Sequence, residues 1–194
     1  LLAWFDQHGR KDLPWQQNRT PYRVWVSEIM LQQTQVASVI AYYQRFMQSF
    51  PDIQTLAAAP EDLVLEHWAG LGYYARARNL HQSAKLVVDE YNSVFPAEFD
   101  AIVALPGIGR STACAILSIA FNQKASILDG NVKRVLCRFE AVKGWPGEKA
   151  TENMLWQLAE ALNPSQRTAD YTQAIMDLGA TLCSRSKPDC ERCP

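Results

Sequence analysis

Residues 105–113 read LPGIGRSTA, and this stretch decides how the chain is organised. Pro106 and Gly107 favour a tight turn after a short helix, because proline presets one backbone angle and glycine tolerates positive φ. The next helix is expected to begin at about Arg110. The N–H groups of its first turn have no partner within the helix and lie at the positive end of the helix dipole, so they favour an anion.

The turn therefore predicts a cradle for a phosphate group. Both glycines permit positive φ and a close backbone approach, and an arginine adds positive charge. The candidate residues are Gly107, Gly109, Arg110 and Ser111. An ordinary connector between two helices is the alternative interpretation, because two glycines one residue apart are weak evidence on their own.

Apolar residues recur at helical spacing on both sides of this turn, and glycines and prolines stand at the joints between the periodic stretches. No stretch alternates apolar and polar residues as a half-buried strand would. The fold class is therefore expected to be all-α. The expected helices cover residues 24–48, 61–68, 73–91, 110–121, 130–140, 148–162 and 166–183.

The composition allows one large domain or two small ones, since the chain has 194 residues of which 48% are hydrophobic. No apolar run reaches the roughly 18 residues that a membrane-spanning helix needs. The net charge of −1 does not by itself indicate a nucleic-acid-binding protein. Residues 73–85, however, carry Arg76, Arg78 and Lys85 and no acid, so one basic face is expected.

Two carboxylates stand in unlike surroundings. Asp129 directly precedes the helix expected at 130–140, where an N-cap carboxylate accepts backbone N–H groups that should keep its pKa low. Glu28 lies in the apolar segment VWVSEIMLQQTQV, where a partly buried carboxyl group should have a raised pKa. Such a pair suits acid and electrostatic catalysis, although a plain N-cap and a solvated glutamate are the alternatives.

Five cysteines occur, and this odd number in a chain without a secretion signal favours free thiols in a reducing cytosol over a disulfide scaffold. Cys183, Cys190 and Cys193 have the spacing C-x6-C-x2-C. Thiolates so spaced indicate an iron–sulfur or zinc site. Cys114 and Cys137 lie in apolar helical patterns and are expected in the core.

Four segments together resemble the endonuclease III superfamily of helix-hairpin-helix DNA glycosylases, and within it the MutY-type adenine-specific enzymes. LPGIGRSTA matches the hairpin, and LDGNVKRV at 128–135 matches the segment that carries the catalytic aspartate. VSEIMLQQTQ at 26–35 is similar to the segment of the catalytic glutamate, and GLGYYARARNLH at 70–81 also matches. The resemblance extends over essentially the whole chain.

The resemblance implies a mechanism for removing adenine from DNA. Glu28 would be the general acid that protonates adenine at N7, and Asp129 would stabilise the sugar cation before water completes the hydrolysis. In the sister endonuclease III enzymes the hairpin carries a nucleophilic lysine, where this chain has Ser111. Strand-nicking lyase activity is therefore expected to be weak or absent. Lys133, one helical turn after Asp129, could still form an incidental Schiff base with the abasic sugar.

The resemblance also implies contacts to the DNA. Gln33 and Tyr73 would wedge between bases and fill the gap that the extruded adenine leaves. Trp15 and Gln173 would line the adenine pocket, and Arg76 and Arg78 would contact phosphates. Further expected substrate or DNA contacts are Asn131 and Lys133. Core packing is the alternative for Tyr73, and phosphate contact or solvation for Lys133.

The architecture implied by the resemblance has two helical lobes with the active site in the cleft between them. Residues 21–124 would form a six-helix barrel that contains the hairpin, and residues 1–20 would join 125–194 in a second, iron–sulfur-type lobe. A [4Fe–4S] cluster would be held by four cysteines spaced C-x6-C-x2-C-x5-C. The printed chain supplies the first three and ends at Pro194, before the place of the fourth.

The expected partner is double-stranded DNA with an adenine:8-oxoguanine or adenine:guanine mispair, bound by a monomer in the bacterial cytoplasm at the nucleoid. Two alternatives come from different classes. One is an endonuclease III-type glycosylase and lyase for oxidised pyrimidines. The other is a helix-hairpin-helix module that binds DNA without catalysis, and the presence of both carboxylates argues against it.

Overall fold

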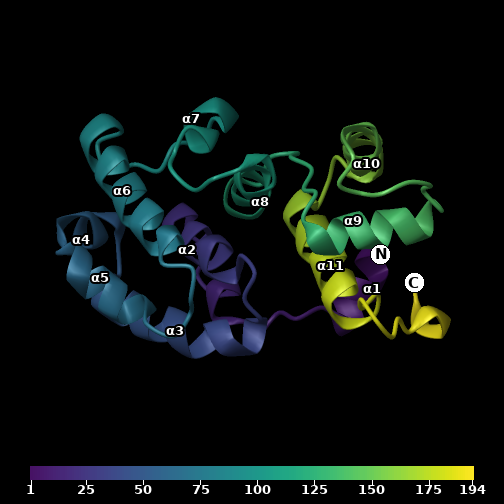
Figure 1. Cartoon of the computed structure of the whole chain (residues 1–194), viewed down its shortest axis with the longest axis horizontal. Coiled ribbons are helices and arrows are strands. Elements are labelled where there is room, and N and C mark those ends of the chain that lie inside the picture. The colour runs from purple at the N-terminus through teal and green to yellow at the C-terminus, as the bar shows by residue number, and fades with distance from the viewer. The chain divides into compact units, whose positions relative to one another are not determined.

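Helices are the only regular secondary structure of the chain, which the computed structural model describes from residue 1 to residue 194 (Figure 1). The expectation of an all-α fold is confirmed. The α-helices are α1 (Leu2–His8), α2 (Pro21–Leu31), α3 (Val36–Ser49), α4 (Ile53–Ala58), α5 (Glu61–Trp68), α6 (Ala75–Glu90), α7 (Phe99–Val103), α8 (Arg110–Phe121), α9 (Gly130–Phe139), α10 (Lys149–Leu162) and α11 (Thr168–Thr181). Two 3₁₀ turns, η1 (Pro14–Gln16) and η2 (Cys190–Arg192), complete the set.

The chain divides into two compact units. The central unit is continuous and runs from Asp12 to Ile116, so it contains η1, α2 to α7 and the first part of α8. The terminal unit joins Leu1–Lys11 to Leu117–Pro194 and contains α1, the rest of α8, α9 to α11 and η2. Glu28 and the hairpin turn thus belong to the central unit, and Asp129 and the C-terminal cysteines to the terminal unit.

The core of the central unit is rich in aromatic side chains. Trp25, Phe46 and Trp68 are fully buried. The ring of Phe46 packs edge-on against Trp68 with centroids 6.2 Å apart, and Trp25 lies 5.2 Å from Phe95. Helix α6 packs against α2, α4 and α5, and so ties the unit together (Figure 1). Burial of such large rings fixes the positions of α2, α3 and α5, which carry Trp25, Phe46 and Trp68.

The terminal unit is built around α9 and α11, which pack against each other, with α10 also against α9 and α1 against α11 (Figure 1). At the crossing, a Cβ atom on Gly179 would lie only 2.7 Å from the Cβ of Asn131, so glycine is needed for this close approach. Arg10 donates from Nη2 to Oδ1 of the fully buried Asp177 at 2.7 Å, and its backbone N–H bonds Oδ2 at 2.8 Å. This ion pair joins the two ends of the chain within one unit.

The expected helix at 24–48 is wrong as a single element, because the structure divides it into α2 and α3. The break lies at residues 32–35, where Gln33 adopts a left-handed backbone with φ of 57°. The stretches expected at 61–68 and 110–121 match α5 and α8. Helices α1 and α4 were not expected, since each is too short to show a convincing apolar period.

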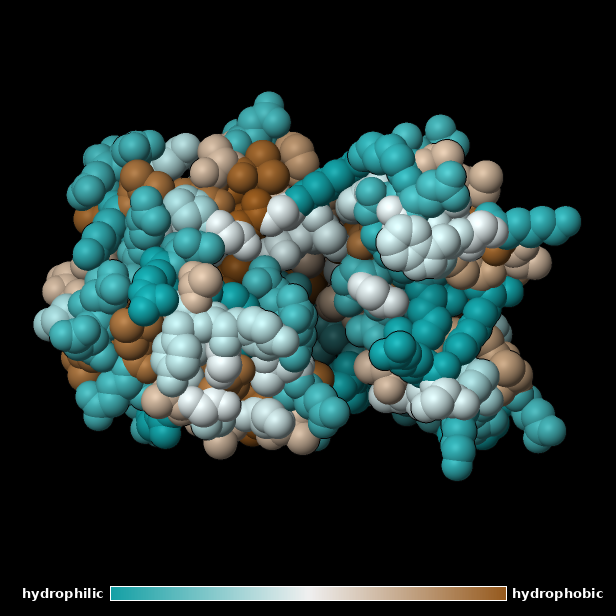
Figure 2. Space-filling model, viewed as in Figure 1, coloured by the Kyte–Doolittle hydropathy of each residue, from teal (hydrophilic) through white to brown (hydrophobic).

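The helices are short and their apolar residues are mostly in the two cores. None of them is both long enough and apolar enough to cross a lipid bilayer. On the face drawn in Figure 2, hydrophobic residues stand in separate small groups among hydrophilic ones. The most exposed of the apolar side chains include Val94, Phe139 and Trp145, which lie in different parts of the sequence.

Candidate functional site

The hairpin between α7 and α8 is held against other helices of the central unit. Ser83 of α6 donates to the carbonyl oxygen of Pro106 at 3.1 Å. The side-chain amide of Gln32, just after α2, lies 3.5 Å from the carbonyl oxygen of Gly107 and 3.5 Å from Oγ1 of Thr112. The turn is thus placed beside the end of α2, and α8 begins at Arg110 as expected.

The structure requires glycine at only one of the two glycine positions of the hairpin. Gly107 has φ of 79°, and an added Cβ would lie 2.9 Å from the Cβ of Asn79, so both conformation and space require glycine. Gly109 does not adopt the positive φ that glycine permits, because it is not among the residues in that region. A Cβ on Gly109 would meet no atom within 4 Å. Packing inside the protein therefore gives no reason for glycine there, and the backbone at Gly109 is open to an approaching ligand.

Glu28 lies on α2, one turn before its end. The helix begins at Pro21 after the N-cap Thr20, whose hydroxyl accepts from the backbone N–H of Arg23 at 3.2 Å. Val24 and Trp25, one turn before Glu28, are buried, and Glu28 itself is half-buried. Glu28 therefore lies at the boundary between solvent and the buried part of α2.

Two exposed loop residues of the central unit have unusual backbone conformations. Gln33 follows α2 and Tyr73 precedes α6, and both have left-handed backbones with φ of 57° and 52°. Such angles are uncommon for residues other than glycine and persist only where the surroundings enforce them. Gln33 is exposed and Tyr73 has 62% of its surface accessible, so packing in the core, the alternative for Tyr73, is wrong.

Arg76 was expected to contact phosphates, and this expectation is wrong. Only 9% of its surface is exposed, and its guanidinium group donates to backbone carbonyl oxygens of the loops at the end of α2 and before α6. Burial lowers the pKa of Arg76, although a guanidinium stays charged in proteins. Arg78, two residues on, is exposed and lies 3.5 Å from Glu61. Its contact with phosphate stays a prediction.

Asp129 in the terminal unit is the N-cap of α9, as the sequence predicted. Its Oδ1 accepts from the backbone N–H of Val132 at 2.7 Å, and its Oδ2 accepts from Nδ2 of Asn131 at 3.4 Å. The side chain is half-buried. The carboxylate is therefore fixed at the positive end of a helix.

The expectation that Asp129 has a low pKa is wrong. Burial raises the pKa of this carboxyl group, and the hydrogen bonds from Val132 and Asn131 offset the rise only in part. Removal of water destabilises the charged form more than the helix-end donors stabilise it. Asp129 is consequently a carboxylate whose charge is incompletely compensated in the protein alone.

Asn131 and Lys133 both have partners within the terminal unit. Asn131 accepts from Nη2 of Arg134 at 2.7 Å, and the same guanidinium donates to the carbonyl oxygen of Gly179 at 2.6 Å. Arg134 was not among the expected site residues. Its place three residues after Asn131 on α9 could have predicted the contact, because residues at this spacing are neighbours on a helix. The Nζ of Lys133 donates to Oε1 of Glu152 on α10 at 2.6 Å.

Trp15 and Gln173, the expected pocket residues, belong to different units. Trp15 is 5% exposed and its ring meets that of Tyr43 at 76°, with centroids 5.5 Å apart. Gln173 is 7% exposed and donates from Nε2 to Oδ1 of Asp177 at 3.0 Å. Both are held by their own unit, and a shared adenine pocket stays a prediction.

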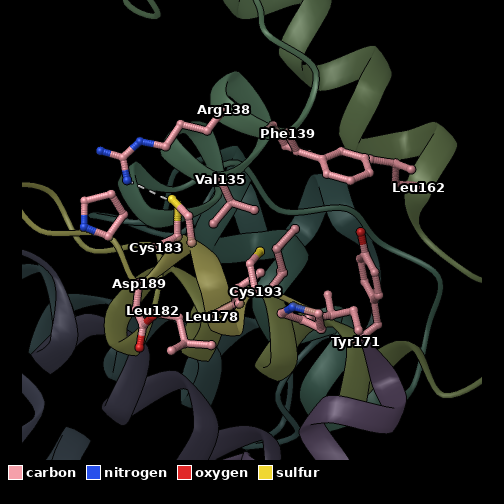
Figure 3. Close-up of a pocket in the computed structure, with 16 residues that line it drawn as sticks. Val135, Arg138, Phe139, Leu162, Tyr171, Leu178, Leu182, Cys183, Asp189 and Cys193 are labelled. Atoms are coloured by element: carbon pink, nitrogen blue, oxygen red, sulfur yellow. Dashed lines mark hydrogen bonds between the residues drawn. The ribbon is translucent and has the colours of Figure 1, made fainter.

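The three C-terminal cysteines line one cavity of about 370 Å³ in the terminal unit (Figure 3). The rest of the lining is mostly apolar and includes Val135, Leu178 and Leu182. Arg138 of α9 donates from Nη1 to Sγ of Cys183 at 3.3 Å, the dashed contact in Figure 3. All five cysteines of the chain are free thiols; Cys114 is buried, as expected, whereas Cys137 is only half-buried.

Comparison with known proteins identifies the family to which this arrangement belongs. Residues 26–161 match the family model described as HhH-GPD superfamily base excision DNA repair protein. The chain belongs to the HhH-GPD superfamily. The matched region contains Glu28, the hairpin and Asp129, so all three candidate elements lie in the part that defines the family.

Two curated relatives of the chain, one bacterial and one mammalian, carry the same name. The chain is 48% identical over its full 194 residues to a protein of Buchnera aphidicola subsp. Baizongia pistaciae named adenine DNA glycosylase, and it covers 55% of that protein. It is 47% identical over 203 aligned residues to the mouse protein of the same name, of which it covers 39%. The chain thus spans about half the length, or less, of these curated relatives.

Solved structures show the same HhH-GPD fold. A thermostable thymine-DNA glycosylase superposes with a TM-score of 0.86 at 29% identity, and the match covers 99% of this chain and 88% of that one. A non-covalent endonuclease III–DNA complex superposes with a TM-score of 0.82 at 23% identity, covering 100% and 87%. The second likeness shows the fold alone.

The three C-terminal cysteines are those that the resemblance assigns to a [4Fe–4S] cluster. A [4Fe–4S] cluster takes four thiolates, and three cysteines line the cavity of this HhH-GPD chain. No group of three or more His, Cys, Asp or Glu side chains comes together so that it could hold a metal ion. The [4Fe–4S] cluster stays a prediction for this chain.

Proposed function

We propose that this chain carries the catalytic activity of an adenine-specific DNA glycosylase. Its substrate is adenine mispaired with 8-oxoguanine or guanine in double-stranded DNA, and it hydrolyses the N-glycosidic bond. The names of the relatives, at 45–48% identity over the full chain, support this reaction. The proposed setting is a monomer in the bacterial cytoplasm, acting at the nucleoid.

The observation that carries the proposal is Asp129. A carboxylate at a helix N-cap, half-buried and with a pKa raised by burial, is suited to stabilise a cation that forms beside it. The charge of such a group is under-solvated, so a developing oxocarbenium ion gains more from it than from a carboxylate in water. A carboxylate that served only as a cap would not need this burial.

Glu28 is the proposed general acid. In its protonated form it donates to N7 of adenine, which makes the base a better leaving group. The C1′–N9 bond then breaks and its electron pair stays with adenine, while Asp129 stabilises the cation left on the sugar. Water adds to C1′ and loses a proton, and Glu28 regains its proton from solvent. The products are free adenine and an abasic sugar.

The proposed reaction leaves the DNA strand intact. A lyase step needs an amine that forms a Schiff base with the abasic sugar. The hairpin carries Ser111 in the place of the sister family's lysine, and the nearest candidate amine on α9, Lys133, is engaged with Glu152. Both features support a monofunctional hydrolase.

The DNA contacts of the proposal are those of the central unit and the start of α9. The hairpin with Gly107, Gly109, Arg110 and Ser111 binds phosphate through backbone N–H groups, and the open space at Gly109 supports a close approach. Gln33 and Tyr73 fill the gap left by the extruded adenine, as their exposure allows. Asn131 lies beside Asp129, and Trp15 and Gln173 complete the base pocket.

A [4Fe–4S] cluster on Cys183, Cys190 and Cys193 belongs to the proposal only as a structural group, and no chemical step depends on it. The shared cavity supports it, but the cluster would need a fourth ligand. Absorbance near ~400 nm in the purified protein, from thiolate-to-iron charge transfer, tests for it.

The decisive experiment compares three duplexes, which carry adenine:8-oxoguanine, adenine:guanine and thymine glycol. Each reaction is analysed with and without hot alkali, which breaks the strand at an abasic site. Cleavage of the two adenine duplexes only after alkali supports the proposal. Nicking of the thymine-glycol duplex without alkali would favour an endonuclease III-type enzyme, and binding without any product would favour a non-catalytic module.

The first prediction concerns the proposed acid. E28Q should lower the single-turnover rate on adenine:8-oxoguanine by roughly 10²–10⁴-fold, because the amide has no acidic proton to give, while binding of the duplex stays measurable. E66Q, at an exposed position of α5, is the matched control and should cleave normally. A wild-type rate in E28Q would remove Glu28 from the mechanism.

A further inference from the structure

The guanidinium group of Arg76 joins two separate loops of the central unit. Its Nη1 lies 3.1, 2.9 and 2.5 Å from the carbonyl oxygens of Ile29, Met30 and Gln32, at the end of α2. Its Nη2 lies 3.1 and 3.2 Å from the carbonyl oxygens of Leu71 and Gly72, in the loop before α6. One buried side chain thus bonds the backbone of both loops.

The carbonyl groups at the end of α2 are only weakly bonded by the backbone. Helix α2 ends at Leu31, and the N–H groups of Gln32 and Thr34 make long bonds, of 3.4 and 3.3 Å, to the carbonyl oxygens of Ile29 and Leu31. These carbonyl groups also form the negative end of the helix dipole, where a cation is favourable. The guanidinium group supplies several donors in a fixed plane, which allows it to serve both loops at once.

Arg76 also contacts side chains in and beside the two loops. Nη2 donates to Oγ1 of Thr34 at 3.1 Å, next to Gln33. The guanidinium carbon lies 5.6 Å from the ring centre of Tyr73 and 5.4 Å from that of the fully buried Trp68. Gln33 and Tyr73 are also the two residues of these loops, other than glycine, with left-handed backbones. Arg76 therefore contacts both loop segments that have a left-handed backbone, at Gln33 and at Tyr73.

From this geometry we infer that Arg76 is a positioning residue for base extrusion. It fixes the separation and orientation of the Gln33 and Tyr73 loops, so that both side chains enter the DNA together. This inference rests on the proposed function, because it assigns a cause to the placement of the proposed wedge residues. Arg76 itself touches neither the adenine nor the sugar.

The inference requires the fork of arginine and not only its charge. A lysine ammonium group is a single point and cannot reach the carbonyl oxygens of both loops in the same geometry. R76K keeps a cation in the core but should release one loop. Misplacement of groups by about 1 Å can lower a rate by roughly 10²-fold, so a large kinetic effect is expected from this conservative change.

The experiment measures base extrusion and chemistry separately. The fluorescent adenine analogue 2-aminopurine replaces the mispaired adenine, and its fluorescence reports unstacking in an E28Q background, where cleavage is blocked. The single-turnover rate constant on adenine:8-oxoguanine is measured with enzyme in excess. R76K should abolish most of the fluorescence rise and lower the rate constant at least roughly 10-fold. Loss of folded protein would change the amplitude of the reaction, but not these properties of the folded enzyme.

Two further variants keep the test decisive. T34V removes one acceptor of the guanidinium group and leaves Arg76 in place, so a two- to threefold fall in the extrusion signal and the rate constant is expected even if R76K does not fold. R45K is the matched control, because exposed Arg45 donates to one backbone carbonyl oxygen, that of His67 near the end of α5, at 3.0 Å. It should behave as wild type.

The possible results separate this inference from the proposed function. Wild-type extrusion and rate in folded R76K would overturn the positioning role and leave the proposed function intact. If R76K does not fold, wild-type behaviour of T34V overturns it instead. If the unaltered chain neither unstacks 2-aminopurine nor releases adenine, both the proposed function and the inference are wrong.

Discussion

The end of α2 and the start of α9 are two helix ends closed by side chains of opposite charge. At α2 a guanidinium group from α6, more than forty residues along the chain, donates to carbonyl oxygens at the end of the helix. At α9 the carboxylate of Asp129, directly before the helix, meets free N–H groups. Both arrangements satisfy groups that every helix leaves unpaired.

The two helix ends differ in how fully the charge of the capping side chain is compensated by hydrogen bonds. Arg76 is buried and surrounded by acceptors, so its charge is used within the protein. Asp129 has fewer donors than its burial demands, and its raised pKa reports this deficit. The guanidinium group at the end of α2 therefore has a structural role. The carboxylate at the start of α9 keeps a partly uncompensated charge that can take part in the reaction.

The largest expected effect that tests this comparison is on the reaction rate of D129N. The substitution should lower the single-turnover rate by roughly 10³-fold, because a neutral amide does not stabilise a cation. The free energy of unfolding should stay unchanged or rise by up to about 1 kcal/mol, since asparagine is an equally good N-cap and no buried charge remains. Activity and chemical denaturation are both measured.

D129A is the control for the cap. It removes the hydrogen bond from Val132 and should cost about 1 kcal/mol of stability, in addition to the loss of rate. If D129N proves as unstable as D129A, the burial of the charge at α9 is compensated after all. The contrast between the two helix ends would then be wrong.

The pH dependence gives a second, smaller effect. Asp129 must be ionised to act, and burial raises its pKa, so activity should fall with decreasing pH at a value above the roughly 4 that is ordinary for aspartate. The acid limb of kcat/KM, which reports the free enzyme, measures it. An acid limb at pH 4 or below would contradict the raised pKa.

The smallest expected effect concerns a cap with no chemical role. Thr20 closes the start of α2 through its bond to the N–H of Arg23. T20A should lower the free energy of unfolding by about 1 kcal/mol and leave the single-turnover rate constant unchanged. Urea denaturation and the kinetic assay check both statements. A change in rate constant as large as that in R76K would show that any loosening of α2 disturbs catalysis, and so would remove what is special about its C-terminal end.

Local signals in the sequence predicted much of the fold. The helices at 61–68 and 110–121 follow from apolar spacing and from the glycines and prolines beside them, and the N-cap role of Asp129 follows from its residue type and place. The break between α2 and α3 could not be predicted in this way. It is stabilised by Arg76 across a long stretch of chain, and no local pattern at 32–35 reveals that partner.

The errors in the site have the same physical origin. Arg76 and Arg78 look alike in the sequence, yet one is buried and the other exposed. A signal did exist, since Arg76 shares the helical face of Leu80, Ser83 and Val87, all buried. The direction of the Asp129 pKa depended on how much water the fold removes, which the sequence does not state.

The ion pair between Arg10 and Asp177 has a consequence for how the chain is made. The central unit is one uninterrupted segment and leaves the ribosome complete, so it can fold while synthesis continues. Leu1–Lys11 emerges before the central unit but has no docking surface until α11 has been translated. These residues therefore wait through the synthesis of the whole central unit before they meet their native partners.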